Sequence, residues 1–177
     1  MNWWKNVFNP HKIHQKLRTI GQINATHIAK NSELPVIAAP VTGQLQQNID
    51  DYEPVRGKNG FMMTPNGNSI VSPVAGIVVE SDQQILVIQS VHNDTISIYL
   101  KTDDFTKSHL AIYNVGQQLH AGDLVGITRG DNQKNSIYII FDRNKVYQFK
   151  TGSVYAGQNI LQQSSDEDDN VATERTN

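Results

Sequence analysis

Tyr99 and Lys101 are the side chains best placed to do chemistry. They lie in the stretch TISIYLKTDD, residues 95–104, which runs from an apolar alternation into a charged corner. Alternate positions on a strand share one face, so Tyr99 and Lys101 lie together with Ser97, and the isoleucines and Leu100 face the other way. The pattern predicts a strand end that displays a hydroxyl and an ammonium group. Adjacent carboxylates follow at Asp103 and Asp104, and we interpret them as turn or solvated residues.

Histidines could supply metal ligands or a nucleophile, but their spacing argues against both. The chain has six histidines and no cysteine, which excludes disulfides, thiolate zinc sites and a cysteine nucleophile. His11 and His14 form a pair in a basic segment with no third ligand near, whereas catalytic zinc takes about three protein ligands. His109 and His120 fall in loop-like segments. We therefore expect no metal site and no cofactor, with these histidines exposed to solvent.

The distribution of charge divides the chain into three parts. The net charge is −2, but residues 1–32 hold five basic side chains and no acid, and residues 164–177 hold five acids and one arginine. The basic head is a short helical or loosely ordered segment, and the acidic, polar tail is typical of disorder. Residues 33–163 form the predicted domain. This central part has no basic stripe, so nucleic acid is not expected as a partner.

Trp3 and Trp4 give the basic head an apolar character, together with Val7 and Phe8. One interpretation is a short helix packed on its own domain. The alternative is a weak contact with a membrane or a partner through the tryptophans and neighbouring lysines, although Pro10 interrupts the pattern. No run has the length of a secretory signal or a membrane span, which favours a cytoplasmic, soluble protein.

Short apolar runs separated by glycine, proline, asparagine and aspartate begin after residue 34, a spacing typical of all-β proteins. No amphipathic helix stands out among them. The predicted strands cover residues 36–39, 43–46, 60–63, 70–72, 76–80, 84–89, 95–100, 124–128, 136–141 and 146–149.

A repeated turn is the least generic feature of this region. The sequence APVTG at residues 39–43 recurs as SPVAG at residues 72–76, each time ahead of a predicted strand. Proline fixes φ and removes an amide donor, and glycine permits conformations that a Cβ excludes. The two copies predict two related turns in an internally repeated β-structure. A third turn, VGQQLHAGDLVG at residues 115–126, predicts two glycine corners separated by a hydrophobic step.

These turns, in this order and with the segment GKNGFMMTP at residues 57–65, resemble the glucose-type IIA domain of the bacterial phosphoenolpyruvate:sugar phosphotransferase system. The resemblance covers about residues 34–128. It implies an all-β fold, an antiparallel β-sandwich or distorted barrel of the duplicated hybrid motif kind. It also implies a partner protein, either a phosphotransferase component or a protein that the domain regulates.

The family uses two histidines on adjacent strands, and the resemblance places them at Gln84 and Tyr99. The family's aspartate matches Asp103, and Asp104 puts a negative charge near the expected phosphate. A tyrosine hydroxyl has a reference pKa near 10 and does not simply replace imidazole. We therefore predict no intact catalytic residue and a pseudoenzyme of sugar transport. Gln84, Tyr99 and Lys101 would form a docking face.

Two alternatives remain open. The chain could be an active phosphocarrier that uses a non-standard histidine, His92 or His109. It also has a distant likeness to lysostaphin-type metallopeptidases, whose histidines would fall on Lys101, Tyr138 and Ile140. None of these side chains is a histidine, so that likeness implies a degenerate module without zinc.

Overall fold

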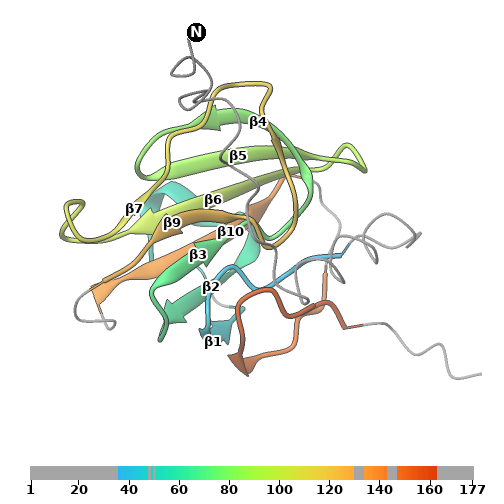
Figure 1. The fold of residues 1–177 in the computed structure, drawn as a ribbon. Coiled ribbons are helices and arrows are strands. Elements are labelled where there is room, and N and C mark those ends of the chain that lie inside the picture. The colour runs from blue at the N-terminus through green and yellow to red at the C-terminus, as the bar shows by residue number, and fades with distance from the viewer. Residues whose placement is uncertain (1–35, 48, 50, 130–133, 143–146, 163–177) are drawn as a thin grey trace, which may run out of the picture.

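The computed structural model describes residues 36–47, 49, 51–129, 134–142 and 147–162, and these residues build two antiparallel β-sheets (Figure 1). The basic head and the acidic tail lie outside the described residues. The larger sheet has the strand order β11-β1-β2-β10-β6-β5-β4-β8, and the smaller one β3-β9-β7. The described elements are β1 (Gly43–Gln46), the 3-10 helix η2 (Glu53–Val55), β2 (Asn59–Pro65), β3 (Ser69–Val71), β4 (Gly76–Ser81), β5 (Ile85–Ser90), β6 (Thr95–Lys101), β7 (His109–Leu110), β8 (Gln118–Leu119), β9 (Leu124–Ile127), β10 (Ser136–Phe141) and β11 (Gly152–Val154).

Apolar residues at alternate positions bind the two sheets together. On β6 the side chains of Ile96, Ile98 and Leu100 are buried and those between them are half-buried. The buried face joins one hydrophobic core that also contains Ile70 of β3 and Val125 of β9. In Figure 1 the smaller sheet lies in front of the β6 and β10 part of the larger one. The prediction of an all-β sandwich is confirmed. The face of the larger sheet that points away from this core, called here the outer face, carries Tyr99.

The repeated turn is a structural duplication. The amide of Ala38, two residues before Pro40, donates to the Pro73 carbonyl at 2.8 Å. The amide of Val71, two residues before Pro73, donates to the Pro40 carbonyl at 2.7 Å. Each copy of the turn therefore binds the other through equivalent atoms. This reciprocal pair joins the two copies directly.

The glycines that end the two repeats, Gly43 and Gly76, serve close strand contact rather than an unusual φ. Neither has a positive φ, whereas Gly116 and Gly122 in the third turn have φ values of 87° and 84°. A Cβ on Gly43 would collide with the Thr64 carbonyl oxygen, and one on Gly76 would collide with the carbonyl oxygen of its partner strand. The expectation that glycine is needed for its backbone conformation is therefore confirmed in the third turn and is wrong for the first two.

The remaining differences concern short elements. The predicted strand at residues 36–39 is reduced to one bridge, Ala38 to Asn159, and of the predicted strand at 146–149 the described part holds one bridge, Phe149 to Leu161. Three strands of two or three residues, β7, β8 and β11, were not predicted. Such short strands are too short for an alternation of apolar and polar residues to identify them.

Candidate functional site

Tyr99 lies in the middle of the larger sheet. Its strand β6 is flanked by β5 and β10, and the residues directly opposite it are Ile85 and Tyr138. Directly opposite residues of antiparallel strands share one face and contact each other. Tyr99 is half-buried and packs against an apolar cluster on the outer face that includes Tyr138, Met62 and Val55. As expected from the sequence, the side chain of Tyr99 lies on the face of the sheet that points away from the core.

A pair of tyrosines supports this cluster from the side. The rings of Tyr52 and Tyr138 stack with centroids 5.0 Å apart and an interplanar angle of 27°. The Tyr138 ring is fully buried, and its hydroxyl donates to Asp51 Oδ1 at 3.0 Å. Burial, and then the bond to the negatively charged carboxylate, raise the pKa of Tyr138 well above its ordinary value. Tyr138 is therefore a neutral donor at any physiological pH.

Two lysines lie over these rings. The Lys58 ammonium is 5.6 Å from the centroid of the Tyr99 ring, and the Lys101 ammonium is 5.6 Å from that of Tyr52. Lys101 also lies 3.8 Å from Asp51 Oδ2, a loose and exposed ion pair. A cation within about 6 Å of a ring face is attracted by the ring quadrupole. Lys58 and Lys101 therefore contact the faces of the Tyr99 and Tyr52 rings as cations.

An open groove of about 450 Å³, called here the outer groove, runs along β6 beside Tyr99. Polar side chains, the apolar side chains of Ile85, Val87 and Ile140, and two carboxylates, Glu80 and Asp142, line this groove. Neither carboxylate forms an ion pair with another described residue. The lining residues are Gly57, Lys58, Asn59, Glu80, Ile85, Val87, Thr95, Ser97, Tyr99, Ile140, Phe141 and Asp142.

Gln84 is not directly opposite Tyr99. It precedes β5, and its carbonyl accepts the amide of Leu100 at 2.8 Å. Its own amide bonds Asp82 Oδ1 at 2.6 Å in a turn. Gln84 is exposed and is absent from the lining of the outer groove. The structure therefore brings Tyr99 and Lys101 to one face and places Gln84 beside Leu100.

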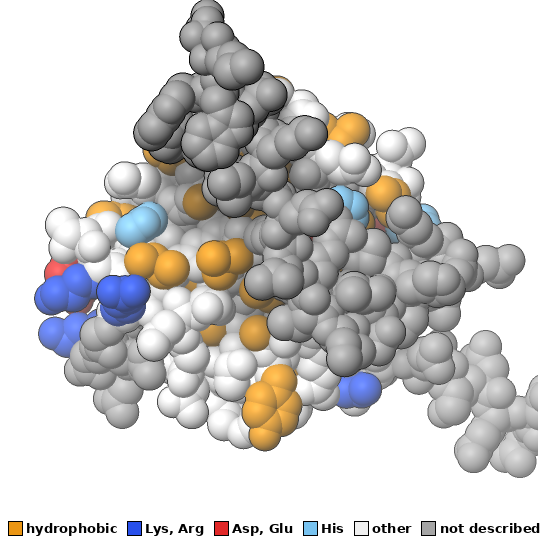
Figure 2. Space-filling model, viewed as in Figure 1, with side chains coloured by type: hydrophobic (Ala, Val, Ile, Leu, Met, Phe, Trp, Pro, Cys, Tyr) orange, Lys and Arg blue, Asp and Glu red, His pale blue; other side chains and the backbone are white. Residues whose placement is uncertain are grey.

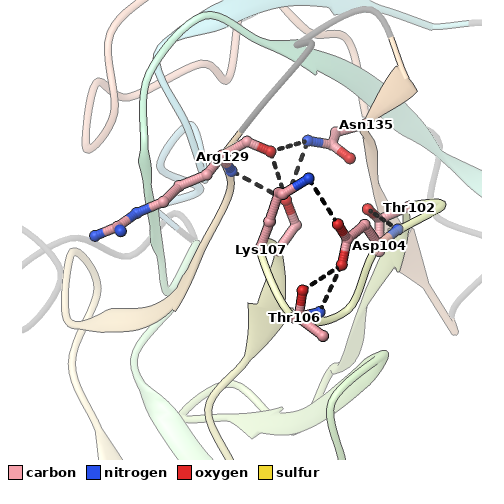
Figure 3. Close-up of polar contacts among 7 residues, drawn as sticks. Thr102, Asp104, Thr106, Lys107, Arg129 and Asn135 are labelled. Atoms are coloured by element: carbon pink, nitrogen blue, oxygen red, sulfur yellow. Dashed lines mark hydrogen bonds and ion pairs between the residues drawn. The ribbon is translucent and has the colours of Figure 1, made fainter.

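Asp103 and Asp104 belong to a second region, called here the polar corner, where β6 turns toward β7 (Figure 3). Asp104 accepts the Thr106 amide at 3.0 Å and hydroxyl at 2.5 Å, and Lys107 Nζ lies 3.0 Å away. The Thr106 bonds, followed by Lys107, lower the pKa of Asp104 from 3.8 to about 2. Asp103 is exposed and lines a hollow of about 270 Å³ with Arg129. The prediction of turn or solvated residues describes both.

Behind this turn lies a buried polar network. Asn135 is 3 % exposed, and its amide nitrogen donates to Thr128 Oγ1 at 2.9 Å and to Ser108 Oγ at 3.2 Å. Ser108 Oγ in turn accepts the Arg129 amide at 3.0 Å. Figure 2 shows basic side chains gathered at this corner of the molecule, at the left of the view, beside an acidic one. The corner joins β7, β9 and β10.

The described histidines lie away from Tyr99. His92 is exposed in the hairpin between β5 and β6, seven positions before Tyr99 (99 − 92), and the four strand steps from Thr95 to Tyr99 alone span about 13 Å at 3.3 Å per residue. His109 opens β7 in the smaller sheet, opposite Ile127, so its expected loop position is wrong. His120 is half-buried, with Nδ1 3.4 Å from Asp123 Oδ2. In the described part of the chain no three acidic or histidine side chains cluster as a metal site would need.

Comparison with known proteins places this architecture. No family model matches the chain, and no curated protein matches it either. Among solved structures, glucose permease IIA from Mycoplasma capricolum is similar, with a TM-score of 0.60 and 23 % identity over 75 % of this chain and 96 % of that one. The fold is IIA-like. Across the described residues of this IIA-like fold, no helix is both long and apolar enough to pass through a membrane.

Sequence reasoning missed most of the neighbours of Tyr99. Tyr52 and Lys58 come from the segment around η2, and Tyr138 comes from β10, so two distant segments meet around one residue of β6. The pattern of residues 136–141 does not predict which face of the sheet Tyr138 occupies, because nearly every side chain of β10 is buried. One signal was available in principle: Tyr138 and Tyr99 lie on strands that the sequence does predict, and Lys101 directly follows one of them.

Proposed function

We propose that this protein is a IIA-like domain that does not transfer phosphoryl groups and that acts by docking other proteins through the face around Tyr99. The observation that carries the proposal is chemical. The residue that the family resemblance places at the position of the phosphoryl acceptor is Tyr99, which is half-buried, and no described residue that lines the outer groove is a histidine. A phosphocarrier needs a nitrogen nucleophile and donors that stabilise the transferred charge.

The surroundings of Tyr99 do not compensate for the loss. A tyrosine hydroxyl needs a base beside it to become a nucleophile at neutral pH. No hydrogen bond to another described residue orients the Tyr99 hydroxyl, and Lys58 lies over its ring rather than beside its oxygen. Glu80 and Asp142 bring negative charge to the groove, which is unfavourable for a phosphoryl group. These features favour binding over group transfer.

The groove has properties that suit a protein partner. It combines apolar sides with polar groups, and its volume of about 450 Å³ falls within the range of ligand-binding clefts. Ile77 and Val79, on the adjoining strand β4, are 49 % and 47 % exposed and extend the apolar surface. Exposed apolar side chains of this kind mark interaction sites when they are contiguous. The partner class is a phosphotransferase component or a regulated protein.

Incubation with phosphoenolpyruvate, enzyme I and the phosphocarrier protein HPr tests the proposal. We expect no stoichiometric acid-labile phosphate on the chain, while a glucose-type IIA protein in a parallel reaction becomes phosphorylated. Mass spectrometry of any labelled chain locates the modified residue. Phosphate on His92 or His109 would overturn the proposal and support the alternative of an active phosphocarrier.

A further inference from the structure

We infer that the outer groove binds the chain's own basic head. The inference rests on the proposed function in one respect, because it takes the groove as the docking face. It goes further by naming an occupant, residues 1–32. The argument uses the charge of the groove, its apolar sides and the place where the described chain begins.

Charge complementarity is the first step. Glu80 and Asp142 line the groove without an ion pair to any described residue, and Lys58, the one lysine or arginine among the described lining residues, lies over the Tyr99 ring. The groove therefore offers two carboxylates to a positive ligand. The head carries five basic side chains and no acid. Of the two terminal segments, only the head has the complementary charge, since residues 164–177 hold five acids.

Apolar complementarity is the second step. In the groove Ile85 is half-buried and Val87 and Ile140 are 8 % and 5 % exposed, and the larger apolar exposure belongs to Ile77 and Val79 on the neighbouring strand β4. The head supplies a matching apolar group at Trp3, Trp4, Val7 and Phe8. Each tryptophan can bury about 150–250 Å² of surface. An amphipathic basic segment therefore fits both the sides and the charges of the groove.

Reach is the third step. Val36, the first described residue, lines the same small cavity as Phe141, and Phe141 also lines the outer groove. Phe8 and Val36 are 28 positions apart (36 − 8), a span of up to about 90 Å when extended. The head can therefore reach the groove from its point of attachment. Covalent attachment also raises its effective concentration above that of a free competitor.

Tryptophan fluorescence of the full chain tests the inference, because the only two tryptophans, Trp3 and Trp4, are both in the head. We expect acrylamide to quench the native chain several-fold less than the same chain unfolded in urea. Asp142→Lys should raise quenching, and Glu80→Lys/Asp142→Lys should raise it toward the unfolded value. The matched control Asp103→Lys reverses an exposed aspartate outside the groove and should leave quenching unchanged.

Four results would overturn the inference. The first is that acrylamide quenches the native chain as strongly as the unfolded chain, and the second is that Asp142→Lys and Asp103→Lys change quenching equally. The third is that quenching of the native chain rises on hundredfold dilution. The fourth is that the tryptophans are protected only when vesicles of phosphatidylcholine and phosphatidylglycerol are present. The third would indicate a second copy of the chain and the fourth a membrane. Thermal unfolding checks that each variant is folded. If Asp142→Lys is not folded, Asp142→Asn is used in its place. Phosphorylation by HPr would overturn the proposed function alone and leave the quenching result standing.

Discussion

The outer groove and the polar corner both adjoin β6, but they differ in how their polar groups are satisfied. In the corner, Asp104 is bound by Thr106 and Lys107, and the buried Asn135 donates to Thr128 and Ser108 (Figure 3). In the groove, the two carboxylates have no ion pair among the described residues. Buried polar groups that bond one another hold a fold, whereas exposed charges without partners are available to a ligand. The polar groups of the corner therefore stabilise the fold, and those of the groove are available for binding.

This contrast also corrects the emphasis that the sequence suggests. The adjacent acids at residues 103 and 104 are more conspicuous in the sequence than the separate acids Glu80 and Asp142. The fold brings Glu80 from β4 and Asp142 from the end of β10 into one groove, 62 positions apart (142 − 80). A charged run in a sequence is thus a poorer guide to a binding surface than charges gathered by the sheet.

The largest expected effect is in the polar corner. Asn135→Ala removes the donor to Ser108 and Thr128 and leaves buried oxygen atoms without it. Unfolding in urea should show a loss of about 1–3 kcal/mol, the cost of leaving buried polar groups unsatisfied. The exposed Gln148→Ala serves as the control and should change the free energy of unfolding by no more than about 0.5 kcal/mol. Equal effects of the two variants would show that the network does not stabilise the fold.

The next effect lies in the tyrosine cluster beside the groove. Tyr138→Phe removes the bond to Asp51 and keeps the ring stack, so the free energy of unfolding should fall by about 0.5–1.5 kcal/mol at neutral pH. Because the folded pKa of Tyr138 is raised, its hydroxyl contributes stability below pH 10 that is lost as the pH rises above 10. The variant should therefore lose less stability than the native chain between pH 9 and about 11. An identical alkaline profile would contradict this role.

The sheet could be predicted from the sequence wherever a strand is long enough to alternate. Residues 43–46, 95–100 and 136–141 were predicted with errors of no more than one residue, and both repeats were recognised as related turns. The outer groove could not be predicted, because its lining comes from five strands and the segment before β2, and strand order decides which residues meet. Gln84 shows the limit most clearly. A difference of one residue in register separates a position beside Tyr99 from one beside Leu100.

The acid side of the pH profile tests whether the turn at Asp104 is structural. The folded pKa of Asp104 is lowered from 3.8 to about 2, so its bonds contribute stability above pH 3.8 that is lost as the pH falls from 3.8 toward 2. Asp104→Asn removes this titration and should flatten the acid unfolding curve in that window. Asp103→Asn is the matched control, since Asp103 lies in the same turn. A steeper curve for Asp104→Asn would refute the turn's assignment.

The smallest effect on stability should come from the groove. Glu80→Gln/Asp142→Asn removes two exposed charges that pair with no described residue, so the free energy of unfolding should change by no more than about 0.5 kcal/mol. The measurement is urea unfolding of the double variant beside the native chain. A loss of more than about 1 kcal/mol would mean that these carboxylates hold the fold, as the corner does, and the contrast between the regions would fail. If the free energy of unfolding changes little while quenching of the tryptophans increases, the two carboxylates contribute to binding of the basic head and not to the stability of the fold.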